Sequence, residues 1–351
     1  MNRFSFAALL TVPLLALFAQ VQIPERSATA LFKGEPGRQR TEIRFDPASG
    51  LVTLKLLVQD PDGHFIPNIR REDFVVYEND VPQTNAKVEV EHPSVSLALL
   101  LEYGGHFPTM NGMIATDVTM AGRQLLEVIG RDDKVAIWKY ADRPELLADF
   151  TQDHQKLENL LYTLDPPGVS EANLYDALMV VSQRMQEVRG RKAVILLSSG
   201  VDTFSKARLE DVLTMLRTSD TTIYVVSLGE IFRQSVALPE AVPPSANFDW
   251  KRAAQELQEI ARASGGRFYA PPSIVGLSGV YDDIMENLKV RYVITYKSST
   301  SGSPNSPRSV RVELVNPKTG GPLQVTDESG RTIQAHVVLQ DKYVPARASG
   351  E

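Results

Sequence analysis

The sequence predicts an α/β domain with a mostly parallel central sheet and helices on both faces, inserted in a smaller β domain of the Ig-like sandwich type. Strand-like and helix-like segments alternate over residues 95–288, and such alternation is typical of a parallel sheet covered on both faces. Strand-like segments over 42–92 and 290–343 flank this region. Because the two ends of a domain often lie close together, one domain can be inserted in another.

The composition is that of a globular protein. The chain has 351 residues, of which 43% are hydrophobic and 23% charged, and this length suits two compact units. The formal net charge is −6, so we expect no nucleic-acid partner. The chain has no cysteine, which excludes disulfides, thiolate metal ligands and a thiol nucleophile.

Residues 1–23 predict a secretory signal peptide that is removed on export. Arg3 precedes an uncharged, mostly apolar run from Phe4 to Ala19, which is shorter than the roughly 20 residues needed to cross a bilayer. An uncleaved membrane anchor is the alternative. We therefore expect an exported protein, periplasmic or secreted, that contacts a membrane only through an uncleaved signal. Residues 24–41 predict a linker.

Residues 42–92 predict the first part of the β domain. Strand patterns cover 51–58 and 73–78, and the second is followed by turn residues at Asn79–Asp80. Apolar and charged residues alternate over 87–91, as in a half-exposed strand.

Residues 95–289 predict the inserted α/β domain. The apolar run Val95–Leu101 is typical of a strand buried on both faces. Further strands are predicted at 133–140, 192–197, 222–227 and 267–269, and helices at 110–129, 154–164, 174–188, 207–219, 250–261 and 275–288. Residues 290–343 return to strand patterns and complete the β domain, and 344–351 form a tail.

The connection over residues 229–249 is long for a strand-to-helix loop, and loops of this length tend to be functional or disordered. It follows the carboxyl end of a predicted strand, the edge where open α/β sheets bind ligands. We expect Ile231 and Phe232 within it to be exposed and to contact a partner. A mobile insertion without a role is the alternative.

Four stretches occur in an order that resembles the exported bacterial von Willebrand factor type A (VWFA)-related family. They are REDFVVYENDVPQ at 71–83, LALLL at 97–101, LYDAL at 174–178 and RKAVILLS at 191–198. The resemblance covers roughly residues 50–343 and implies the VWFA fold, which is Rossmann-like.

Members of that family typically bind a divalent cation at a metal-ion-dependent adhesion site, formed by a DxSxS loop, a Thr and a later Asp. Hard oxygen ligands of this kind suit magnesium. The resemblance places the five ligand positions on Glu102, Gly104, His106, Ala172 and Ser199. Only Glu102 keeps a carboxylate and only Ser199 a hydroxyl, so we expect a degenerate site without bound magnesium or another cofactor.

Three remnants of this site have alternative interpretations. Asp202 follows Ser199 by three residues and is a candidate replacement ligand. Glu102 and His106 lie on one short loop and are candidates to hold a softer or weakly bound divalent cation. The alternative is that these residues are solvated polar side chains of loops.

The resemblance implies a non-enzymatic protein-binding, adhesion or scaffold module in the cell envelope or outside the cell. We expect it to bind a protein partner at the C-terminal edge of the sheet without a bridging Mg²⁺. Ser198 and Ser199 lack the G-x-S-x-G pattern of a nucleophile elbow, so no catalytic residue is assigned. The alternatives are an enzyme or enzyme subunit with an unrecognised site around Glu102 and His106, and a purely structural role in an assembly.

Overall fold

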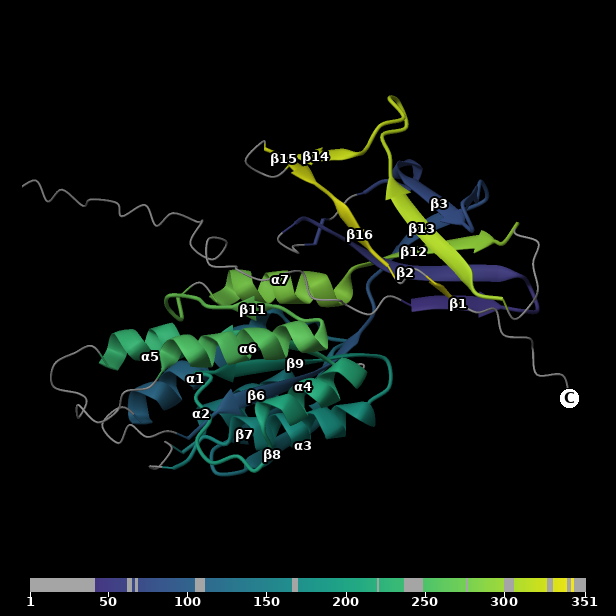
Figure 1. The fold of residues 1–351 in the computed structure, drawn as a ribbon. Helices are drawn as coiled ribbons and strands as arrows, with labels where there is room; N and C mark the ends of the chain where they lie inside the picture. Colours follow the sequence, from purple (N-terminus) through teal and green to yellow (C-terminus); the bar gives the residue numbers. More distant parts are fainter. Residues whose placement is uncertain are drawn as a thin grey trace, which may run out of the picture.

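The computed structural model describes residues 42–343 except 62–64, 67–68, 105–110, 166–169, 220, 237–248, 276, 300–305, 327–330 and 340–341. The predicted signal peptide, linker and tail lie outside the described residues. Within the described part of the chain, no helix is long and apolar enough to cross a membrane. Figure 1 shows an α/β unit and a separate β unit joined by the chain.

The α/β unit is built on a six-stranded sheet with the order β11-β10-β9-β6-β7-β8. Its strands are β6 (Val95–Glu102), β7 (Lys134–Tyr140), β8 (Pro144–Thr151), β9 (Arg191–Ser198), β10 (Thr222–Ser227) and β11 (Phe268–Tyr269). Neighbouring strands are parallel, except that β8 pairs with β7 in the antiparallel direction. The sequence did not predict β8, because this edge strand is partly exposed and carries no continuous apolar run.

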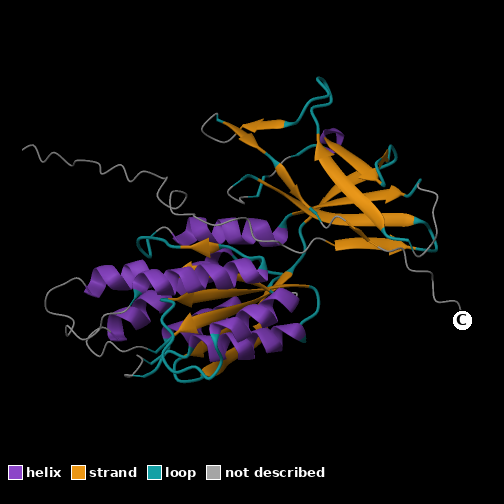
Figure 2. Ribbon diagram, in the orientation of Figure 1, coloured by secondary structure: helices purple, strands orange, loops and turns teal. Residues whose placement is uncertain are grey.

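Helices cover both faces of this sheet (Figure 2). Residues of α1 (Asn111–Val128), α2 (His154–Tyr162), α5 (Gly229–Val236) and α7 (Leu277–Lys289) pack in one core cluster. Residues of α3 (Leu174–Gln186), α4 (Leu209–Thr218) and α6 (Trp250–Ser264) pack in the other. Along β6, Leu97 and Leu99 face the first cluster and Ala98 and Leu100 the second, which explains the continuous apolar run. The predicted α/β fold is confirmed.

The β unit combines strands from both ends of the chain. Before the α/β unit lie β1 (Glu42–Asp46), β2 (Leu51–Gln59), a short 3-10 helix (Arg71–Asp73), β3 (Phe74–Glu78), β4 (Val81–Pro82) and β5 (Lys87–Glu91). After it lie β12 (Arg291–Lys297), β13 (Arg308–Leu314), β14 (Gln324–Thr326), β15 (Thr332–Gln334), β16 (His336–Val338) and β17 (Lys342–Tyr343). β12 pairs with β2 and β5, β16 pairs with β2, and β13 pairs with β3. The α/β unit is therefore inserted between strands that share sheets.

The stretch 71–83, one of the four stretches with family resemblance, has a structural role in the β unit. Asn79 and Asp80 have φ angles of 48° and 61° in the turn between β3 and β4, and short polar side chains tolerate this left-handed region. The carboxylate of Glu78 is fully buried and accepts a hydrogen bond from Arg308 Nη1 at 2.9 Å. This contact joins β3 to β13, and the buried carboxylate of Glu78 is not accessible to a ligand.

The prediction that Ile231 and Phe232 are exposed is wrong. Residues 229–236 form helix α5 instead of an open connection, and residues 237–248 lie outside the described residues. Ile231 is 8% and Phe232 is 2% exposed, and both pack in a core cluster with Leu228. Leu228, Ile231 and Phe232 have the i, i+3, i+4 spacing of one helix face, so they stabilise the core and are not available to a partner.

Candidate functional site

The candidate site lies where the carboxyl ends of β6 and β9 meet in the middle of the sheet. The chain continues from β6 to β7 on one side, and from β9 to β10 on the other. Open α/β sheets bind ligands at such a switch in strand order. Glu102 is the last residue of β6 and Ser198 the last of β9, so the topology brings two singled-out positions together.

The carboxylate of Glu102 is buried, at 4% exposure, and is surrounded by hydrogen-bond donors. Its Oε2 atom accepts from Tyr140 Oη at 3.1 Å, Ser198 Oγ at 2.9 Å and Ser199 N at 2.6 Å. Its Oε1 atom accepts from Ser199 Oγ at 2.8 Å. We call Glu102, Tyr140, Ser198 and Ser199 the Glu102 cluster. The interpretation of Glu102 as a solvated loop residue is therefore wrong, because its side chain lies inside the protein.

Burial governs the electrostatics of the Glu102 cluster. Desolvation raises the pKa of Glu102, while the hydrogen bonds from Ser199, Ser198 and Tyr140 oppose that rise. Burial and the neighbouring Glu102 carboxylate raise the pKa of the Tyr140 hydroxyl well above its usual value. Tyr140 therefore remains a hydrogen-bond donor across the physiological range.

The donor set does not fit the oxygen shell of a magnesium ion. Both oxygens of Glu102 already face hydroxyl and amide donors, and Ala172 has no side-chain oxygen. A Cβ on Gly104 would lie 2.2 Å from the carbonyl oxygen of Glu171, so a serine there requires the backbone to move. His106 lies outside the described residues. In the chain as described, no group of three or more His, Cys, Asp and Glu side chains is placed to hold a metal.

Asp202 is directed to helix α3. Its Oδ1 atom accepts hydrogen bonds from Tyr175 N at 3.2 Å and from Ser205 Oγ at 2.6 Å. Tyr175 belongs to the first turn of α3, where a negative charge is favourable because amide groups there lack helical partners. These contacts give Asp202 a structural role beside the Glu102 cluster.

Asn173 is a residue of the site that was not predicted from the sequence. It is 8% exposed and links three loops at the carboxyl edge of the sheet. Its backbone N donates to Ala141 O at 2.8 Å and its Nδ2 to Asp142 O at 2.8 Å. Its Oδ1 accepts from Thr203 Oγ1 at 3.1 Å and Phe204 N at 3.0 Å. An asparagine directly before a helix is a start signal, but this side chain cross-links loops and does not cap α3.

A family model described as von Willebrand factor type A domain matches residues 111–201. The match begins with α1 and extends past Ala172 and Ser199. The chain contains a von Willebrand factor type A domain. No curated protein sequence matches the chain significantly.

Several solved structures resemble this VWFA-containing chain at low sequence identity. The conserved hypothetical protein BatB from Bacteroides thetaiotaomicron has a TM-score of 0.42 at 14% identity, over 55% of this chain and 98% of that protein. The von Willebrand factor type A protein from Catenulispora acidiphila has a TM-score of 0.44 at 11% identity, over 80% and 74% of the two chains. Proximal thread matrix protein 1 from the mussel byssus has a TM-score of 0.42 at 14% identity, over 59% and 49%.

Proposed function

We propose that this chain is a non-enzymatic protein-binding module, of the adhesion or scaffold type, that binds its partner at the carboxyl edge of the VWFA sheet without a bridging magnesium ion. The observation that carries this proposal is the Glu102 cluster. The carboxylate in the position of the family's first metal ligand accepts its hydrogen bonds from Tyr140, Ser198 and Ser199. In this proposal the hydrogen-bond donors of these three residues take the place that a magnesium ion has in the family's metal site.

The loops around the Glu102 cluster supply the binding surface in this proposal. Asn173 holds the turn at 141–142 and the loop that begins at Thr203 in fixed positions through its hydrogen bonds. A surface that is already ordered loses little conformational entropy when a partner binds. Recognition without a metal therefore rests on direct contacts with these loops.

The burial of the hydroxyl groups supports a non-enzymatic role. Tyr140 and Ser198 are 0% exposed and Ser199 is 3% exposed. A nucleophile or general acid must reach the reacting atoms of a substrate, and these hydroxyls face Glu102 inside the protein instead. The Glu102 cluster thus gives no support to the enzyme alternative. The predicted signal peptide supports a location in the cell envelope or outside the cell.

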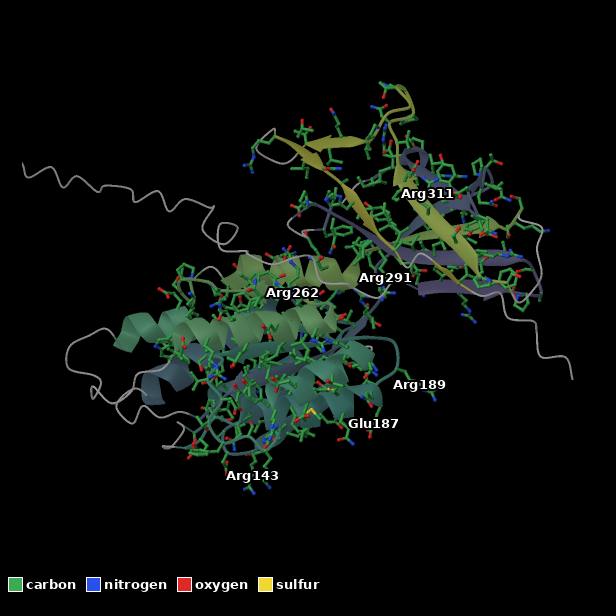
Figure 3. All side chains as sticks on the ribbon, viewed as in Figure 1. Arg143, Glu187, Arg189, Arg262, Arg291 and Arg311 are labelled. Carbon is green, nitrogen blue, oxygen red and sulfur yellow. The ribbon has the colours of Figure 1, made fainter. Side chains whose placement is uncertain are left out.

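Site-specific photo-crosslinking tests this proposal. A photoreactive amino acid is placed at Arg143, in the turn after β7, or at Arg189, before β9; both residues are exposed. Figure 3 shows these two residues on different sides of the α/β unit. The purified variants are mixed with envelope and secreted fractions of the source cells in EDTA. We expect one protein to cross-link from position 143 and not from position 189.

Two results would overturn the proposed function. One is a cross-link at position 143 that forms in Mg²⁺ and disappears in EDTA, since a bridging cation would then be required. The other is equal cross-linking from positions 143 and 189, since binding would then not be confined to the carboxyl edge.

A further inference from the structure

The loop of residues 203–208, between β9 and α4, is fixed to the start of α3. Thr203 and Ala172 exchange two hydrogen bonds: Thr203 N donates to Ala172 O at 3.1 Å, and Ala172 N donates to Thr203 Oγ1 at 2.9 Å. Further along the loop, the carboxylate of Asp176 accepts from Lys206 N at 3.0 Å and from Ala207 N at 2.9 Å. The backbone of the loop is therefore held at several points although it forms no helix or strand.

Exposure alternates along this loop. Thr203, Ser205 and Ala207 are half-buried against the protein, whereas Phe204, Lys206 and Arg208 are exposed. The Phe204 side chain is 72% exposed. A single exposed apolar residue is common on protein surfaces. Phe204 differs because its own N–H is fixed by Asn173 and because two cationic residues follow it on the same exposed side of the loop.

Two acidic side chains close to these cations, Asp176 and Asp211, are directed to backbone amides, whereas Glu210, two residues after Arg208, is exposed. Asp176 accepts from the amides of Lys206 and Ala207, and Asp211 Oδ2 accepts from the amide of Arg208 at 2.9 Å. The chain as a whole carries a net charge of −6. Two cations beside Phe204, against the one exposed carboxylate of Glu210, thus give this loop a local excess of positive charge next to an apolar ring on an acidic protein.

We propose that Phe204, Lys206 and Arg208, which we call the outer row, form the docking surface for an acidic polypeptide segment that carries an apolar side chain. The apolar side chain of the partner covers the ring of Phe204, and its carboxylates pair with Lys206 and Arg208. Aromatic residues and arginine are the residue types enriched at the energetic centres of interfaces. This inference rests on the proposed function and names the chemistry of the partner.

The outer row lies at the edge assigned to partner binding. Asn173 Oδ1 accepts from Phe204 N, and Asn173 Nδ2 donates to Asp142 O, next to Arg143. Two protein cations can therefore take the negative charge of a partner at the edge where family members use a metal ion. Ion pairs between side chains need no metal ion, so EDTA should not weaken the binding of the partner. Salt should weaken it, because salt screens the charges.

Binding of defined peptides by the full chain tests the inference. The probe is a fluorescent synthetic peptide of aspartate and glutamate residues around one central leucine, and anisotropy in EDTA reports its affinity. Burying an apolar side chain contributes enough for Phe204→Ala to weaken binding by about tenfold. The double variant Lys206→Glu/Arg208→Glu replaces attraction by repulsion and should also weaken binding by about tenfold or more.

The controls separate this surface from general charge. The double variant Arg189→Glu/Arg217→Glu carries the same change in charge at exposed residues of the opposite edge and should bind as the wild type does. A peptide with serine in place of leucine should bind more weakly, and a lysine peptide should not bind.

Three outcomes overturn the inference: no binding of the acidic peptide, equal binding by Phe204→Ala, and equal loss in the two double variants. If position 143 still cross-links to a protein in EDTA, such an outcome refutes the docking role of the outer row but not the proposed function. A cross-link that needs Mg²⁺, or that forms equally from position 189, removes the proposed function itself.

Discussion

Replacing Glu102 by alanine removes the acceptor at the centre of the Glu102 cluster. Tyr140 Oη and Ser198 Oγ lie 2.8 Å apart and can bond to each other. Ser199 N and Ser199 Oγ both donate to Glu102 and would lose this acceptor. A buried donor without a partner costs about 1–3 kcal/mol, and the lost side chain leaves a cavity. We therefore expect Glu102→Ala to lower the free energy of unfolding by about 2–4 kcal/mol.

Urea unfolding at neutral pH, followed by circular dichroism, measures this loss. Glu102→Gln keeps one acceptor oxygen and the shape of the side chain, so it should lose less than about 1.5 kcal/mol. Glu127→Ala, at an exposed position of α1, is the control and should stay within about 0.5 kcal/mol of the wild type. If Glu102→Ala were as stable as Glu127→Ala, the reasoning about the Glu102 cluster would be refuted.

Three further predictions concern pH, the Gly104 position and helix α5. Burial raises the pKa of Glu102, so the folded protein binds this proton more tightly than the unfolded chain; the free energy of unfolding should fall as the pH rises above the usual glutamate range. Urea curves of the wild type and Glu102→Gln across pH test this, and a constant difference between them would contradict it. Gly104→Ala should lower the free energy of unfolding by about 1–3 kcal/mol, because its Cβ would lie 2.2 Å from a carbonyl oxygen. The control Gly279→Ala, whose Cβ would have nothing within 4 Å, should not destabilise the protein. Equal melting temperatures for the two variants would count against the crowding at Gly104. Phe232→Ala should lose about 3–5 kcal/mol in urea unfolding because the ring is buried, and a loss under about 1 kcal/mol is inconsistent with that burial.

Much of the fold could be predicted because hydrophobic periodicity records burial directly. The run Val95–Leu101 is apolar at nearly every position because both faces of β6 are covered. The strand β8 escaped prediction since an edge strand with exposed Glu145 and Leu146 lacks that pattern. Helix α5 escaped prediction because the length of the connection at 229–249 suggested an open loop. Its i, i+3, i+4 apolar spacing was a signal that pointed to a helix.

The candidate site was only partly predictable. The resemblance placed Glu102 and Ser199 at matching positions, but the hydrogen bond between them joins residues 97 positions apart and depends on the register of β6 and β9. The hydrogen bond from Tyr140 to Glu102 depends on the pairing of β7 with β6, which places these two residues opposite each other. Asn173 joins loops that meet only in the folded chain. A single sequence carries no record of such contacts.

The central claim, that internal hydrogen bonds replace the metal ion in this VWFA domain, is tested most directly by thermal unfolding with and without divalent cations. The melting temperatures of the wild type and of Glu102→Ala are measured in EDTA and in excess Mg²⁺ or Mn²⁺. Because a ligand that binds the folded form raises its stability by RT ln(1 + [L]/Kd), a functional site would raise the melting temperature. We expect the wild-type melting temperature to be the same in EDTA and in excess cation. A rise of several degrees in the wild type that is absent in Glu102→Ala would show that Glu102 still binds a metal, and would contradict the claim.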